Sequence, residues 1–228
     1  MTTTITLTLT NQEVNRLFTR EIKDGVNVYE KLMNKVEYLI KLCQRRRAYA
    51  FISLYQMNES IESLTQQFDE DIDRYEEILQ KKKHLVGKKI TYYPRHFPEV
   101  VFDNTLSGSL IKLFEIYDHL ISLIKTLRAV GCFAHDDEYF NTLRHYFKEV
   151  NRLLSSLLFH SIKKQPSIRL DEAVDFEESY TPNGTIDYTL LYKALTSNVA
   201  PRIQEKTRKP LISLLKRRLQ AEQLLSLA

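Results

Sequence analysis

The sequence predicts a mainly α-helical fold with a short β-ribbon. The 228 residues include only five glycines and six prolines, so long stretches contain no residue that breaks a helix. Apolar residues recur at helical spacing through most of these stretches. Two short segments, at 2–10 and 88–96, alternate residue by residue instead, as strands do. The length suits one domain with a buried core, so we expect a single domain over 1–228.

Within this domain the sequence pattern separates three regions. Residues 26–86 form a long helical region, and residues 87–160 contain a ribbon and a helix pair. Residues 161–228 contain an acidic loop followed by a basic C-terminal helix. The expected helices are 12–19, 26–43, 49–86, 106–128, one from about Asp136 to Leu157, and one from about Pro210 to Leu225. A short strand is expected at 100–102.

Several helix ends carry recognisable signals. Asn11 is a suitable N-cap for the first helix, and the Ser-Gly-Ser run at 107–109 is interpreted as the N-cap of the 106–128 helix. The acidic run at 136–138 fits the first turn of the next helix, where carboxylates favour the positive end of the helix dipole. That helix is expected to bury one stripe, which consists of Phe140, Leu143, Phe147, Val150, Leu154 and Leu157.

The segment from Lys88 to His96 combines alternation with basic and aromatic residues. As a strand it places Lys89, Thr91, Tyr93 and Arg95 on one face. A β-ribbon with such a face can enter the DNA major groove, where Lys, Arg and Thr meet base edges and phosphates. An ordinary solvated edge strand is the alternative. The predicted DNA-binding residues are Lys88, Lys89, Thr91, Tyr93, Arg95 and His96.

The N-terminal segment is a rival ribbon. As a strand, 2–10 carries Ile5, Leu7 and Leu9 on one face and threonines on the other. The threonine face lacks the cations that supply most DNA affinity, so we prefer the internal segment. The secondary DNA-binding candidates are Thr4, Thr6, Thr8, Arg45, Arg46 and Arg47.

Charge is segregated along the chain although the net charge is only +4. Residues 59–77 are strongly acidic, and the segment from Lys81 to Arg95 that follows contains no acid. A second acidic block covers 171–178, and the tail from Arg202 to Arg218 is basic. Segregated basic blocks suit a polyanionic partner such as double-stranded DNA.

Other function classes find little support in the sequence. There is no glycine-rich phosphate loop and no GxSxG, HExxH or CxxC spacing, so we expect no enzyme, no metal, no cofactor and no small-molecule substrate. His145 and Glu149 lie four apart on a predicted helix, but a surface pair explains them better than half a metal site. No signal peptide or membrane helix is evident, and Cys43 and Cys132 suit reduced thiols of a cytoplasmic protein.

The order of long charged helix, basic strand, helix, glycine turn and helix resembles the AcaB family of transcriptional regulators from conjugative plasmids and integrating conjugative elements. The resemblance covers about residues 43–160. Its motifs are Ala-Tyr-Ala at 48–50, Pro-Glu-Val-Val-Phe at 98–102, Leu-Ser-Gly-Ser-Leu at 106–110, Tyr-Asp-His-Leu at 117–120, Leu-Arg-Ala-Val-Gly at 127–131 and Leu-Arg-His-Tyr-Phe at 143–147.

The resemblance implies a ribbon-helix-helix type homodimer, elaborated by additional long helices, that binds DNA and activates conjugative transfer genes. In that fold one strand from each subunit pairs across the dimer, and the helices from Leu106 and from about His135 interlock. We therefore expect a cytoplasmic, nucleoid- or plasmid-associated transcriptional regulator. The alternative is a helical adaptor or scaffold of a conjugation or secretion system, which would bind protein partners through its long helices and its acidic 59–77 face.

Overall fold

The computed structural model describes residues 3–23, 25–82, 92–159, 169–170, 180–181, 184–202 and 205–225. The chain forms two compact units, the first made of Met1–Met33 and Ser60–Leu158 and the second of Asn34–Glu59 and Phe159–Ala228. Helices dominate both, and each small antiparallel sheet has two strands. At this level the predicted fold class, mainly α with a short β element, is confirmed. The dimer stays a prediction.

The elements of the first unit are β1 (Thr3–Thr6), α1 (Gln12–Thr19), β2 (Glu21–Lys23), β3 (Val26–Asn27), β4 (Glu99–Phe102), α4 (Thr105–Ala129) and α5 (Asp136–Phe159). Two helices, α2 (Val28–Gln44) and α3 (Ala48–Lys81), contribute to both units. The second unit adds β5 (Tyr180–Thr181), β6 (Gly184–Thr185), α7 (Tyr188–Thr196) and α8 (Glu205–Leu225). Gly25 supplies the positive φ of 74° that the turn between β2 and β3 requires.

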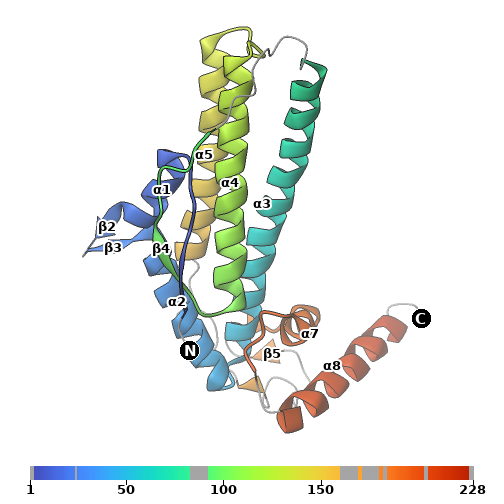
Figure 1. Cartoon of the computed structure of the whole chain (residues 1–228). Helices are drawn as coiled ribbons and strands as arrows, with labels where there is room; N and C mark the ends of the chain where they lie inside the picture. The colour runs from blue at the N-terminus through green and yellow to red at the C-terminus, as the bar shows by residue number, and fades with distance from the viewer. Residues whose placement is uncertain are drawn as a thin grey trace. The chain divides into compact units, whose positions relative to one another are not determined.

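The core of the first unit lies where α4, α5 and the second half of α3 run side by side (Figure 1). Phe68 of α3 packs against Tyr117 of α4 and Tyr146 of α5, with ring centroids 5.9 and 5.5 Å away. All three side chains are buried. Burying an aromatic ring of this size contributes about 2–3 kcal/mol. Apolar and aromatic residues at helical spacing form the buried stripe of α4; these are Leu110, Leu113, Phe114, Tyr117, Ile121 and Ile124.

The predicted stripe of α5 is confirmed in its second half, where Val150, Leu154 and Leu157 are buried, and is wrong by one residue in phase in its first half. Phe140 and Phe147 are exposed, whereas the preceding tyrosines, Tyr139 and Tyr146, are buried. The adjacent aromatic pairs allow either phase from spacing alone. Tyr146 is the inward residue because its hydroxyl donates a 2.8 Å hydrogen bond to Asp71 on α3, which phenylalanine cannot do.

The start of α4 also differs from the prediction. Its N-cap is Asn104, and the Ser-Gly-Ser run at 107–109 lies inside the first turns. The Asn104 side chain accepts from the Ser107 N–H at 2.8 Å, while the Ser107 hydroxyl accepts from the Asn104 N–H at 3.2 Å. This reciprocal pair is a capping box in which serine takes the place of the usual Glu or Gln. Asn11, by contrast, is the predicted N-cap of α1, but its side chain makes no capping bond.

The second unit contains one helix that the periodicity did not predict, α7, which is short and begins at an N-cap bond from the Leu190 N–H to Asp187. Helix α8 begins five residues before Pro210, where the sequence predicted its start. Helix α3 ends at Lys81, five residues before the predicted end of the 49–86 helix. Among the residues described, no helix is long and apolar enough to span a membrane.

Candidate nucleic-acid interface

The predicted basic strand is described only in part. Residues 92–95 have no regular secondary structure, so the predicted strand is wrong there. Lys88, Lys89 and Thr91 lie outside the described residues. The reason for the irregular backbone is local, since Pro94 lacks the N–H that a regular strand ladder needs.

The side chains at the end of this segment are nevertheless accessible. Tyr93 is 74% exposed, and Arg95 is exposed as well. Among the residues described, Arg95 makes no ion pair. His96 is half-buried. Tyr93 and Arg95 are therefore available to a partner, although not as part of a strand.

The backbone of Leu9 joins this segment to the N-terminal one. The Leu9 N–H donates to the His96 carbonyl at 2.9 Å, and the Leu9 carbonyl accepts from the N–H groups of Arg95 and His96 at 2.9 and 3.0 Å. The pairing continues through the Leu7 N–H, which donates to the Pro98 carbonyl at 3.0 Å, into the β1–β4 sheet. The N-terminal segment thus pairs antiparallel, within one chain, with residues 95–102, which include Arg95 and His96 at the end of the rival segment.

The register sorts the side chains of this intrachain ribbon (residues 3–9 and 95–102) into two faces. Thr4 lies opposite Val101 and Thr6 opposite Glu99, while Ile5 lies opposite Val100. Because cross-strand partners share a face, the first two pairs belong to one face and the third to the other. The exposed members of the first face, which we call the outward face, are Thr4, Thr6, Thr8, Phe97, Glu99 and Val101.

The outward face offers hydroxyls and apolar groups rather than charge. Threonine hydroxyls donate and accept hydrogen bonds, so they can meet any base edge or a phosphate. Phe97 is 60% exposed and Val101 39%, and apolar groups of this kind contact the methyl of thymine. Of the six residues named for this face only Glu99 is charged, and the exposed cation Arg95 lies at the end of the ribbon. Phosphate attraction would therefore act at that end.

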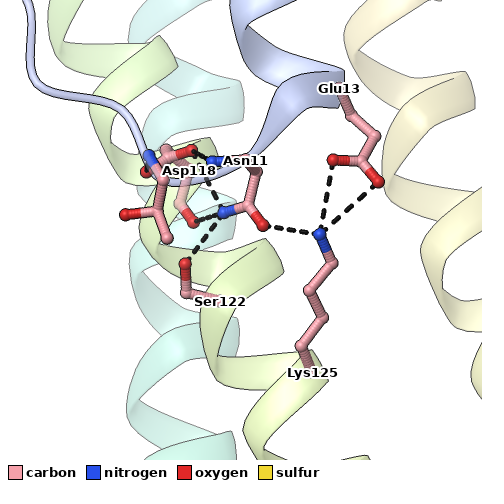
Figure 2. A network of polar contacts seen from close by, with 6 residues as sticks. Asn11, Glu13, Asp118, Ser122 and Lys125 are labelled. Atoms are coloured by element: carbon pink, nitrogen blue, oxygen red, sulfur yellow. Dashed lines mark hydrogen bonds and ion pairs between the residues drawn. The ribbon is translucent and has the colours of Figure 1, made fainter. Parts of the chain in front are cut away.

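The inward face fixes the ribbon on the helices. Leu7, Leu9 and Val100 are buried, as the alternation of 2–10 predicted for its leucines. Beyond the ribbon the chain is held by polar contacts with α4 (Figure 2). Asp118 accepts from the N–H groups of Thr10 and Asn11, both at 2.8 Å. These bonds hold the start of α1 to the middle of α4.

Asn11 completes this anchor, which we define as Asn11, Asp118, Ser122 and Lys125 (Figure 2). Its amide nitrogen donates to Asp118, to the Asp118 carbonyl at 2.9 Å and to the Ser122 hydroxyl at 2.8 Å. Its amide oxygen accepts from the Lys125 ammonium at 2.6 Å. The Asn11 side chain makes no N-cap bond because α4 uses all of its polar atoms. Asp118 is a buried carboxylate whose oxygens accept hydrogen bonds, and such burial is tolerable only with these partners.

The secondary candidates Arg45, Arg46 and Arg47 form the turn between α2 and α3, in the second unit. Arg46 has a positive φ of 58°, and its carbonyl accepts from the Leu170 N–H at 2.8 Å. Arg45 is exposed, whereas the other two are partly covered. These arginines belong to a different compact unit from the ribbon.

The histidines and acids of α5 have structural roles. The Ala134 N–H donates to Glu138 at 3.0 Å and Arg128 pairs with Asp136 at 2.9 Å, which confirms the helix-start interpretation of 136–138. Glu149 pairs with Arg152. An open groove of about 810 Å³ between α3 and α5 is lined by His135, His145 and Tyr146 among others. Within the described ranges no group of three His, Cys, Asp or Glu side chains could hold a metal ion.

Sequence reasoning missed Phe97, Glu99 and Val101 as members of the outward face. The signal was present, because these odd-numbered residues continue the parity of Tyr93 and Arg95. It was obscured because the pairing of 95–102 with 3–9 joins segments about ninety residues apart. Periodicity reports the face of each strand but not its partner.

No family model matches the chain, and no curated protein matches it either. One solved structure is similar, a selenomethionine-containing AcaB from uropathogenic E. coli. The similarity covers 94% of this chain and 97% of that chain, with a TM-score of 0.49 and 9% sequence identity. A similarity at this level establishes neither the family nor the function of the chain, so the family stays a prediction.

Proposed function

We propose that the chain is a sequence-specific DNA-binding transcriptional regulator that reads the major groove with the outward face of its intrachain ribbon. The observation that carries the proposal is the pairing of 95–102 with 3–9, which brings Arg95 and His96, the end of one expected DNA-binding segment, beside the threonine segment that was the other. A two-stranded ribbon matches the width of the major groove, about 12 Å. The proposal therefore replaces the predicted strand over 88–96 with this ribbon.

Different residues of the interface have different roles in this proposal. Thr4, Thr6 and Thr8 read base edges through hydrogen bonds, and Phe97 makes apolar contact in the groove. Arg95 attracts phosphates at the end of the ribbon, together with Lys88 and Lys89, which precede it in the sequence. Thr91, Tyr93 and His96 contact the DNA backbone and position the protein on it. This division explains how an almost uncharged reading face belongs to a DNA-binding protein, since affinity comes from the flanking cations.

The remaining parts of the proposal rest on the sequence resemblance. The regulator acts as a homodimer, activates conjugative transfer genes, and works in the cytoplasm on plasmid or nucleoid DNA. It catalyses no reaction and requires no cofactor.

The test is selection of bound duplexes from a random pool, followed by titration of the selected duplex. For the purified chain we expect a consensus site and a specific complex that survives competitor DNA. T4A/T6A/T8A should reduce discrimination against mismatched sites by roughly 1–3 kcal/mol for each lost base contact. T189A, which removes an exposed threonine from α7 in the other unit, is the matched control. A wild-type chain without any consensus would contradict the proposal.

The second candidate function is a helical adaptor, and a different observation favours it. The acidic side chains of α3 are exposed as predicted, among them Asp69, Glu70, Asp73, Glu76 and Glu77. Such a face suits a basic protein partner. If the selection yields no consensus, capture of a basic partner protein that D69N/D73N/E76Q/E77Q abolishes would support the adaptor.

A further inference from the structure

The exposed side of α8 is basic. Lys209, Lys216 and Arg217 are exposed, and their spacing of seven and eight residues places them on one side of the helix. The sequence contains no acid between 207 and 220. Among the residues described, Lys216 and Arg217 make no ion pair. We call these three cations the α8 basic face.

Two further cations of α8, Arg208 and Arg218, contact α7. The Arg208 guanidinium donates to the Leu195 carbonyl through Nε at 3.1 Å and Nη2 at 2.6 Å. Arg218 donates to the Tyr188 hydroxyl at 2.8 Å and lies 5.1 Å from the centroid of the same ring. These contacts hold α8 in one rotation on α7. The helix therefore presents the α8 basic face outward in a fixed orientation.

We propose that the α8 basic face binds the phosphate backbone of double-stranded DNA without reading sequence. This proposal rests on the proposed function only because DNA is the partner in both. It adds a second DNA-contacting surface to that of the ribbon. Lysine and arginine side chains that neutralise phosphates release condensed counterions, which gives affinity with a steep dependence on salt. Such contacts supply what the nearly neutral outward face of the ribbon lacks.

A membrane surface is a poorer match for the same helix. A helix that lies on a bilayer needs an apolar face to bury among the lipids. The apolar side of α8 is already used, because Leu215 is completely buried and Leu211 and Leu219 are partly covered. Leu214 is 40% exposed, and this one side chain is too small an apolar surface for membrane binding. The charge of the α8 basic face therefore favours nucleic acid as the partner.

The test measures binding of the full chain to a random-sequence duplex and to its selected duplex between about 0.05 and 0.2 M salt. K216A/R217A should make the slope of log K against log salt shallower by about 2 on both duplexes, with roughly tenfold weaker binding at low salt for each lost contact. Sequence preference should be unchanged. K216R/R217K keeps both charges and should bind as the wild type does. K41A/K193A removes two exposed lysines elsewhere in the same unit and should leave the slope unchanged.

Each of the following outcomes supports or overturns the α8 proposal. If K216A/R217A matches K41A/K193A while the wild type binds its selected duplex, the α8 proposal is overturned and the ribbon proposal stands. If the wild type binds duplexes without preference and K216A/R217A loses that binding, the α8 proposal stands and sequence-specific regulation fails. A wild type that binds anionic vesicles but no duplex overturns both.

Discussion

Among single residues, Asp118 has the largest influence on the ribbon. It is buried in the middle of α4, and its carboxylate accepts from the backbone of Thr10 and Asn11 at the end of the N-terminal segment. A buried carboxylate with several hydrogen bonds is costly to create and costly to disturb. The position of the ribbon therefore depends on a contact with a residue 107 positions further along the chain.

Replacing Asp118 with Ala should lower the free energy of unfolding by about 2–4 kcal/mol, because it leaves the backbone N–H groups of Thr10 and Asn11 without their acceptor. Urea unfolding measures this change. Glu115→Ala, an exposed carboxylate on the same helix, should change stability by less than about 0.5 kcal/mol. Hydrogen exchange should speed up in residues 3–11. Equal stability of the two variants would show that the anchor in Figure 2 does not hold the ribbon.

Buried tyrosines form a second set of influential residues. Burial raises the pKa of Tyr29, Tyr117 and Tyr146 well above the ordinary value of 10.0. For Tyr146 the hydrogen bonds with Tyr75 and Asp71 add to the effect of burial. The folded protein therefore keeps these phenols neutral where the unfolded chain would ionise them.

This difference predicts a loss of stability in alkali. Below pH 10 both states hold the phenol protons, so the contribution is complete there; above pH 10 the unfolded chain releases protons that the folded chain retains, so stability falls as pH rises. The slope should approach about 1.4 kcal/mol per pH unit for each such tyrosine. Urea unfolding from pH 8 to 11 measures this slope. Tyr146→Phe removes one of these phenols, so the slope should become shallower by about 1.4 kcal/mol per pH unit. A slope identical in that variant would contradict the assignment.

At the scale of elements, the capping box of α4 sets where the ribbon ends and the helix begins. Asn104→Ala should lower stability by about 1 kcal/mol, because it leaves the Ser107 N–H without its side-chain acceptor. Thermal unfolding measures the effect, with Asn141→Ala on the exposed side of α5 as the control. If both substitutions cost the same, the cap at Asn104 contributes nothing beyond helix propensity.

The elements also separate what periodicity can predict from what it cannot. The helices α1, α2, α4 and α5 follow from apolar spacing and lie close to their predicted positions. The buried side of the first half of α5 does not follow, since Tyr139 and Phe140, like Tyr146 and Phe147, are adjacent aromatics that fit either phase. At the second pair, the hydrogen bond of Tyr146 to Asp71 on α3 favours the tyrosine. Helix α7 has too few turns for a periodic signal and depends on its cap and its packing.

The candidate site divides in the same way. Exposure of Thr4, Thr6 and Thr8 was predictable from strict alternation, and so was the burial of Leu7 and Leu9. The pairing of 95–102 with 3–9 was not, because register between distant strands is set by the shared buried face and by the anchor at Asp118.

For the whole molecule, we propose that recognition and affinity belong to different surfaces. In this proposal the outward face of the ribbon, in the first unit, reads sequence, while cations at Arg95 and on the α8 basic face bind phosphates. An interface of this kind predicts strong salt dependence with specificity that survives loss of single cations. Threonine substitutions should therefore change the discrimination between DNA sites, whereas lysine substitutions should change the salt dependence of binding.

The most direct measurement is photo-crosslinking from Phe97 to the selected duplex. Replacement of Phe97 by a photoreactive phenylalanine analogue keeps an aromatic group at an outward position that is 60% exposed. The same analogue at Phe140, which is 44% exposed on α5, is the control. If the outward face of the ribbon reads the groove, we expect base crosslinks from position 97 and none from position 140. A bound complex that crosslinks from 140 but not from 97 would contradict it.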